Sequence, residues 1–156
     1  MRLDLQTWAA GIESSAVGAW MRESAVAYPT ANILHLLGLV LLLGAIGIVD
    51  LRIAGAFRTL PLQATVRALT PLGIAGLVLL ALTGPLLFMA DATALVRSDV
   101  FARKLVLIGF AFLNARLFRW QLRRGGEPRA WMRLGAIVSL LLWIMVAVLG
   151  RLIAYR

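Results

Sequence analysis

His35, the only histidine of the 156-residue chain, is the residue whose chemistry is easiest to define from the sequence. It stands within residues 31–49, a run that contains no charged side chain. Imidazole can ligate haem iron or copper, and it can relay a proton. An ionisable side chain inside a membrane segment indicates a functional site, whereas a neutral histidine that forms a hydrogen bond between two helices is the structural alternative.

Three basic residues and one methionine are expected near the depth of His35. Arg103 and Lys104 begin the third apolar segment of the chain, and Arg151 lies near the end of the fourth. Cations around one histidine could bind haem propionates, a quinone head group or lipid phosphates. Met89, at the end of the second segment, could form a His/Met pair. The alternatives are basic side chains that extend to head groups and a methionine that fills the core.

The second apolar segment carries its own polar feature at a comparable height. Thr83 precedes the pair Gly84-Pro85, which predicts a kink. Proline has no N–H, so the carbonyl of Ala81 loses its helical donor and leaves a polar group exposed.

A second candidate cluster lies toward the other membrane surface. Asp50 is near the C-terminal end of the first segment, where the helix dipole disfavours an anion, so it needs a partner. Asn114, Arg116 and Arg119 of the third segment occur at a matching depth. We expect a contact between Asp50 and Arg116 or Arg119. A structural brace is the favoured interpretation, and a proton or ligand site is the alternative.

Composition excludes several kinds of chemistry. The chain has no cysteine, which rules out disulfides, thiolate metal sites and cysteine nucleophiles. It shows no catalytic triad, paired carboxylates, phosphate-binding glycine loop or zinc motif, so hydrolase and kinase chemistry are not supported and a non-enzymatic role is favoured. The net charge of +9 does not indicate nucleic acid, because arginines cluster at the ends of apolar runs, where membrane topology requires them.

The hydropathy pattern predicts an all-α membrane protein with a single domain over residues 1–156. The chain is 62% hydrophobic, whereas soluble domains contain about 45–50% apolar residues. Gly38, Gly44 and Gly47 allow helices to approach closely, and Ser98-Asp99 is a plausible N-cap. We expect an amphipathic helix in the membrane interface, or packed on the bundle surface, followed by a bundle of four transmembrane helices, over about residues 3–23, 29–51, 68–90, 101–120 and 134–154.

The distribution of positive charge predicts the orientation. Arginine is most frequent in the first and third connections, and the third, residues 123–129, reads RRGGEPR. The positive-inside rule then places both termini outside, in the periplasm if the membrane is a bacterial inner membrane.

Several segments resemble those of an uncharacterised family of small bacterial four-helix membrane proteins, which has no assigned activity. The most specific element combines His35-Leu36-Leu37-Gly38 with Asp50-Leu51-Arg52. The later matching segments are Leu82-Thr83-Gly84, Phe101-Ala102-Arg103-Lys104-Leu105 and Leu113-Asn114-Ala115.

A looser resemblance connects the chain to copper-resistance D-type membrane proteins and to HemJ-type protoporphyrinogen oxidases. Those proteins also carry a histidine in an early helix and a lysine that opens a later one, here His35 and Lys104. The resemblance implies haem binding at His35. Members often have a second histidine in the later helix, but here that region contains Asn114 and Arg116 instead, so two histidine ligands from one chain are excluded.

Three hypotheses for the function are consistent with these residues. The first is a protein that binds haem b for electron transfer, through His35 alone, through His35 with Met89, or across a dimer of the chain. The second is a non-enzymatic accessory or scaffold subunit of a larger membrane complex. The third is a protein that handles copper at His35 or transports a small solute. Membrane lipids are expected partners in every case.

Overall fold

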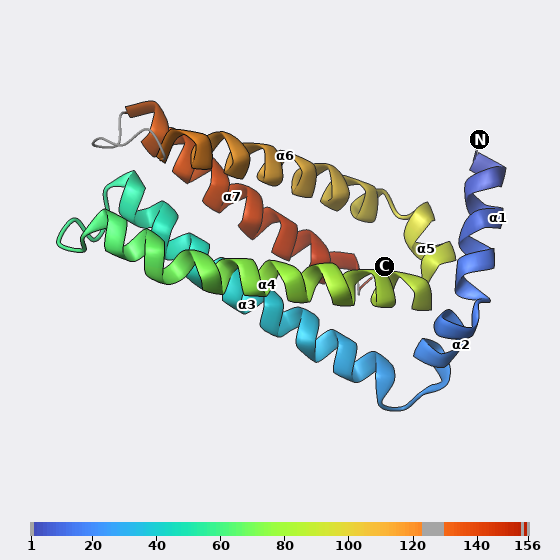
Figure 1. Ribbon diagram of the computed structural model, residues 1–156. Coiled ribbons are helices and arrows are strands. Elements are labelled where there is room, and N and C mark those ends of the chain that lie inside the picture. Colours follow the sequence, from blue (N-terminus) through green and yellow to red (C-terminus); the bar gives the residue numbers. More distant parts are fainter. Residues whose placement is uncertain (1, 123–129, 154, 156) are drawn as a thin grey trace.

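The computed structural model describes residues 2–122, 130–153 and 155, and these residues form seven helices and no strand. The all-α prediction is therefore confirmed. The four long helices are α3 (Ala27–Ala54), α4 (Leu62–Ala90), α6 (Asp99–Leu122) and α7 (Ala130–Ile153). The three short helices lie together at one end of the long ones (Figure 1), and they are α1 (Arg2–Glu13), α2 (Ala16–Glu23) and α5 (Ala92–Arg97).

Three of the long helices, α3, α4 and α7, are long and apolar enough to cross a membrane. The shortest of them, α7, has 24 residues, which rise by about 36 Å and exceed the ~30 Å of a hydrocarbon core. α6 has the same length as α7 but carries Asp99, Arg103, Lys104 and Arg116, and it is not among the three. These apolar helices are consistent with a membrane protein.

The long helices pack in the order α4, α3, α7, α6. Neighbours run in opposite directions (Figure 1): on α3 and α4, His35 lies beside Gly84 and Ile46 beside Gly73. On α6 and α7, Lys104 lies beside Gly150 and Asn114 bonds Gly135. Over the described ranges α6 packs on α7 but makes no backbone approach to α3 or α4, so the predicted bundle of four transmembrane helices is not shown. The rings of Phe88 and Phe101 stack 5.6 Å apart and connect α4 to α6 at the end where α5 lies.

Glycine brings α3 and α4 together. A Cβ on Gly38 would lie 2.9 Å from the carbonyl oxygen of Gly76, and a Cβ on Gly76 would lie 2.6 Å from the carbonyl oxygen of Gly38. Any side chain at either position would therefore push the backbones apart. The predicted role is confirmed for Gly38 but is wrong for Gly44, which faces open space, while Gly47 makes an ordinary contact with Leu140.

The predicted single helix over residues 3–23 is wrong, because the chain breaks at Ser14 and Ser15 into α1 and α2. The hydroxyl oxygen of Ser15 accepts a hydrogen bond of 3.2 Å from the N–H of Gly18 and so begins a new helix. Gly18 in turn lies against α4, where a Cβ would be 2.9 Å from the carbonyl oxygen of Met89. The break redirects the chain so that α2 packs on the end of α4.

The connection over residues 91–99 also contains structure that the sequence analysis did not predict, the short helix α5. The predicted N-cap of α6 at the end of this connection is confirmed, because the N–H of Phe101 donates to the hydroxyl of Ser98 over 3.3 Å. α6 therefore starts directly after α5.

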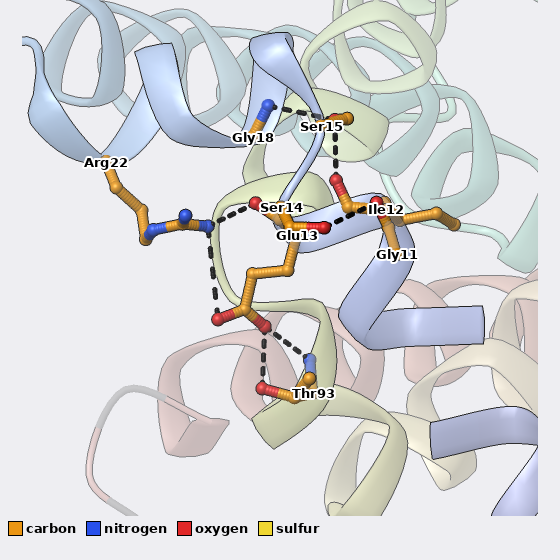
Figure 2. A network of polar contacts seen from close by, with 8 residues as sticks. All are labelled: Gly11, Ile12, Glu13, Ser14, Ser15, Gly18, Arg22 and Thr93. Atoms are coloured by element: carbon orange, nitrogen blue, oxygen red, sulfur yellow. Dashed lines mark hydrogen bonds and ion pairs between the residues drawn. The ribbon is translucent and has the colours of Figure 1, made fainter. Parts of the chain in front are cut away.

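Glu13 joins the N-terminal helices to α5 (Figure 2). Its Oε2 accepts hydrogen bonds from the N–H and the hydroxyl of Thr93, at 2.8 and 2.6 Å. Arg22 donates to the carbonyl oxygen of Glu13 over 2.6 Å, and its guanidinium lies 3.9 Å from Oε1. Thr93 is in the first turn of α5, where N–H groups lack helical partners, and the preceding Asp91 provides no side-chain cap. Glu13 therefore caps α5 from another helix.

We predict that acid releases α1 from α5. The hydrogen bonds from Thr93, together with the charge of Arg22, hold the pKa of Glu13 below its ordinary value. A lowered folded-state pKa means that this stabilisation is present above the unfolded-state pKa and is lost as the pH falls through the folded-state pKa. The hydrogen-exchange protection factors of the amides in α1 and α5, which correct for the slower chemical exchange in acid, should therefore fall at acidic pH.

Glu13→Gln should lower the protection factors of α1 and α5 at neutral pH and remove most of their dependence on acid. Glu23→Gln, at an exposed position on α2, is the matched control. Unchanged protection of α5 in Glu13→Gln would show that the cap is not what holds the two helices together.

Candidate functional site

The four long helices contribute to one site near the end where the short helices lie. We call it the His35 site, and it consists of His35 on α3, Thr83 and Gly84 on α4, Lys104 on α6, and Gly150 on α7. The glycine contact between α3 and α4 lies one turn away from His35, at Gly38. The same close approach therefore places the histidine against α4.

His35 is held by a directed hydrogen bond. Its Nδ1 lies 2.8 Å from the hydroxyl oxygen of Thr83, which is 4% exposed. The hydroxyl lies 2.6 Å from the carbonyl oxygen of Leu79 and donates to it. A hydroxyl has a single hydrogen, so Thr83 must accept the bond from Nδ1–H of His35. The proton of the neutral ring is thus assigned to Nδ1, and Nε2 keeps its lone pair.

Gly84 leaves room beside the imidazole. A Cβ at this position would lie 3.6 Å from Cε1 of His35, so a side chain longer than that of alanine would meet the ring. Pro85 follows within α4, and the helix continues to Ala90. The helix thus continues through Gly84-Pro85, and the kink expected there stays a prediction.

Lys104 is a half-buried cation at this site. Its Nζ lies 3.2 Å from the position that a Cβ of Gly150 would occupy, so the absence of a side chain on α7 makes room for the ammonium. The charge of Lys104 acts on the ring of His35. The described side chains give Lys104 no hydrogen bond and no ion pair. An anionic group is therefore the complement that this ammonium lacks.

The remaining members of the predicted set lie elsewhere. Arg103 is exposed. Arg151 is also exposed, and its guanidinium donates to the hydroxyl of Tyr155 over 2.6 Å and lies 4.8 Å from the centre of that ring. Met89 follows Thr83 by six residues, which corresponds to a rise of about 9 Å along α4 and a different helix face. The structure thus brings Lys104, but not these three residues, to His35.

Asp50 forms a second polar site on α3, and it is 4% exposed. The hydroxyl of Ser139 on α7 hydrogen-bonds its carboxyl group, and the other oxygen, Oδ2, has no partner. The predicted contact with Arg116 is wrong, because α7 separates α3 from α6 and the Arg116 side chain is exposed. The side chain of Arg119 lies outside the described residues.

Asn114, the other member of the predicted cluster, also contacts α7. Its amide donates to the carbonyl oxygen of Gly135 over 3.2 Å. It therefore braces α6 on α7 and does not join Asp50.

Sequence reasoning missed Ser139, although a signal was present. The buried positions of α7 recur at three- and four-residue spacing, and Ser139 is the polar member of that stripe, which comprises Met132, Ala136, Ser139, Trp143 and Val146. A hydroxyl on the buried face of an apolar helix needs an interhelical partner. The stripe could therefore have identified Ser139 as the partner of a buried acid.

The described residues hold no group of three or more His, Cys, Asp or Glu side chains that could bind a metal ion. No family model, curated protein or solved structure matches the chain. The function is therefore inferred from the geometry of the His35 site and of Asp50.

We predict that Thr83→Val releases the ring of His35. The variant keeps the shape of the side chain but leaves Nδ1–H without an acceptor, which should lower the free energy of unfolding by about 1–3 kcal/mol. Because the chain has one histidine, ¹⁵N-histidine labelling reports on this residue alone. The spectrum should show the Nδ1-protonated tautomer in the wild type and a mixture in Thr83→Val.

Thr70→Val, at a half-buried position on the same helix, is the control and should leave the tautomer unchanged. An Nε2-protonated ring in the wild type would contradict the assigned direction of the hydrogen bond.

Proposed function

We propose that the chain is a multi-pass protein of a bacterial inner membrane with four transmembrane helices. The connectivity supports α6 as the fourth. α4 ends at the side of the His35 site, whereas α7 begins at the opposite side and ends at the side of the His35 site (Figure 1). α6 lies between them in the chain and therefore carries it back across the same depth. Its 24 residues rise by about 36 Å, which is long enough. Lys104 then lies within the span and faces protein instead of lipid.

The proposed orientation places both termini in the periplasm. The connections at the opposite end, between α3 and α4 and between α6 and α7, are the ones rich in arginine. Arg52 and Arg58 at the first of these ends bond carbonyl oxygens of the loop, those of Leu60 and Gly55.

Cysteine labelling tests this topology without interference, because the chain contains no native cysteine. In intact cells a membrane-impermeant maleimide should label Asp99→Cys at the start of α6. It should label Ala130→Cys at the start of α7 only after permeabilisation, since both positions are exposed and α6 separates them. Thr59→Cys, in the connection between α3 and α4, should behave like Ala130→Cys. Equal labelling of positions 99 and 130 in intact cells would contradict a crossing by α6.

We further propose that the His35 site binds haem b. The observation that carries this proposal is the 2.8 Å contact between Nδ1 of His35 and the hydroxyl of Thr83, whose assigned direction leaves the lone pair on Nε2. Histidines that ligate metals commonly donate their other ring N–H to a protein oxygen, which sets the orientation of the ring. Thr83 supplies such an oxygen from the neighbouring helix.

Lys104 is the residue that favours haem over a bare metal ion. Its half-buried ammonium lacks an anion, and a propionate carboxylate is one. When bound, haem b would supply one-electron transfer. Within the chain, Thr83 would orient His35, Gly84 would leave space beside the ring, and Lys104 would hold the anionic group. The resemblance to HemJ-type proteins, carried by His35 and Lys104, points in the same direction.

The scaffold hypothesis remains the second candidate, and one observation favours it. The bond between His35 and Thr83 also fastens α3 to α4, which a buried histidine can do without any cofactor. No observation on the described side chains favours copper, since they include no group of three or more His, Cys, Asp or Glu side chains that could hold a metal ion.

Optical spectra of the detergent-purified protein, expressed with adequate haem supply, distinguish the two candidates. We predict a Soret band that shifts on reduction with dithionite and that His35→Ala abolishes. Thr83→Val should weaken haem affinity by about 10–100-fold, the usual effect of removing a hydrogen-bond partner of a ligating histidine. Lys104→Gln should also weaken it, whereas Arg116→Gln, an exposed cation on the same helix, should not. A spectrum without visible absorption would contradict haem binding and favour the scaffold.

A further inference from the structure

Asp50 is an acidic residue that lies among buried apolar side chains. It lies on α3 between Val49 and Ile53, which are 5% and 1% exposed and pack against Ala136 of α7 and against the first turns of α4. Asp50 itself is 4% exposed. Its carboxyl group is therefore removed from water on the sides formed by both neighbouring helices.

No cation among the described side chains compensates this carboxyl group. On α3 itself, Arg52 donates to the carbonyl oxygen of Leu60. The basic residue of α4 nearest this end, Arg67, is exposed and donates to the carbonyl oxygen of Gln63. On α7, Arg133 is exposed, and Ser139 is the group that reaches the acid.

The charge state is determined by these surroundings. An ionised carboxylate that is buried without a counter-charge costs several kcal/mol, at the least, relative to water. A bound proton removes that charge and needs only one oxygen. A metal cation would need about six oxygen ligands, whereas Asp50 and Ser139 together offer three oxygen atoms.

We propose that Asp50 is a proton-binding site within the membrane, with its carboxyl group in the neutral acid form and the hydroxyl of Ser139 donating to its carbonyl oxygen. The Oδ2 atom without a partner is the oxygen that carries the proton. This site is independent of the His35 site, because the two residues are separated along α3 by a helical rise of about 22 Å. A proton can thus be held near the cytoplasmic end of α3 whether or not a ligand occupies His35.

Infrared difference spectroscopy of the protein in lipid bilayers tests this proposal. At neutral pH we expect a carboxylic-acid C=O stretching band that is absent from Asp50→Asn. The band should move to higher frequency in Ser139→Ala, because the hydrogen bond to the carbonyl oxygen is lost. It should be unchanged in Asp91→Asn, an acid outside the long helices, and in Arg116→Gln, the cation that the sequence suggested as a partner of Asp50.

The same spectra can also contradict the proposal. If Asp50→Asn removes a carboxylate band instead, Asp50 is ionised and the proposal is wrong. Replacing potassium by sodium in the buffer provides a further test, since loss of the acid band in sodium would mean that a metal cation, not a proton, is the ligand. Should Asp50→Asn fail to fold, the frequency shift in Ser139→Ala decides, and no shift in that variant would overturn the proposal.

Discussion

Two glycines set the distance between α3 and α4, and the geometry of the His35 site depends on that distance. Gly38 and Gly76 each occupy a position where a Cβ would meet the carbonyl oxygen of the other at less than 3 Å. Helices in lipid gain little from hydrophobic burial against each other and associate through close packing and hydrogen bonds. His35 lies one turn before Gly38, so the same contact that joins the helices brings its ring within hydrogen-bonding distance of Thr83.

α7 organises the rest of the molecule. It packs on α3 and on α6, and polar side chains from both of these helices contact α7 at small residues. The carboxyl group of Asp50 meets Ser139, the amide of Asn114 meets the carbonyl of Gly135, and the ammonium of Lys104 meets the space left by Gly150. Small residues on one helix thus receive the polar groups of its neighbours, which lets apolar helices hold a few polar groups at defined depths.

Hydropathy and length were enough to predict the long helices, because an apolar segment of this length has few alternatives. The depth shared by His35, Thr83 and Lys104 could also be read from their distances to the segment ends. The partner of Asp50 could not, because depth does not say which helices are neighbours: Arg116 has a suitable depth, but α7 lies between α3 and α6. The division of residues 3–23 was missed for a similar reason, since the cap at Ser15 and the packing of Gly18 on α4 depend on tertiary contacts.

The central claim is that the glycine contact between α3 and α4 places His35 on Thr83. A dipolar-coupling measurement in lipid bilayers, on protein carrying ¹⁵N-histidine and ¹³C-threonine, tests it directly because the chain has one histidine. The ring nitrogen should couple to a threonine carbon in the wild type and in Gly44→Leu, where the added side chain enters open space. The coupling should be lost in Gly38→Leu, whose side chain separates the helices. A wild-type protein without this coupling, or a coupling that survives Gly38→Leu, would contradict the account.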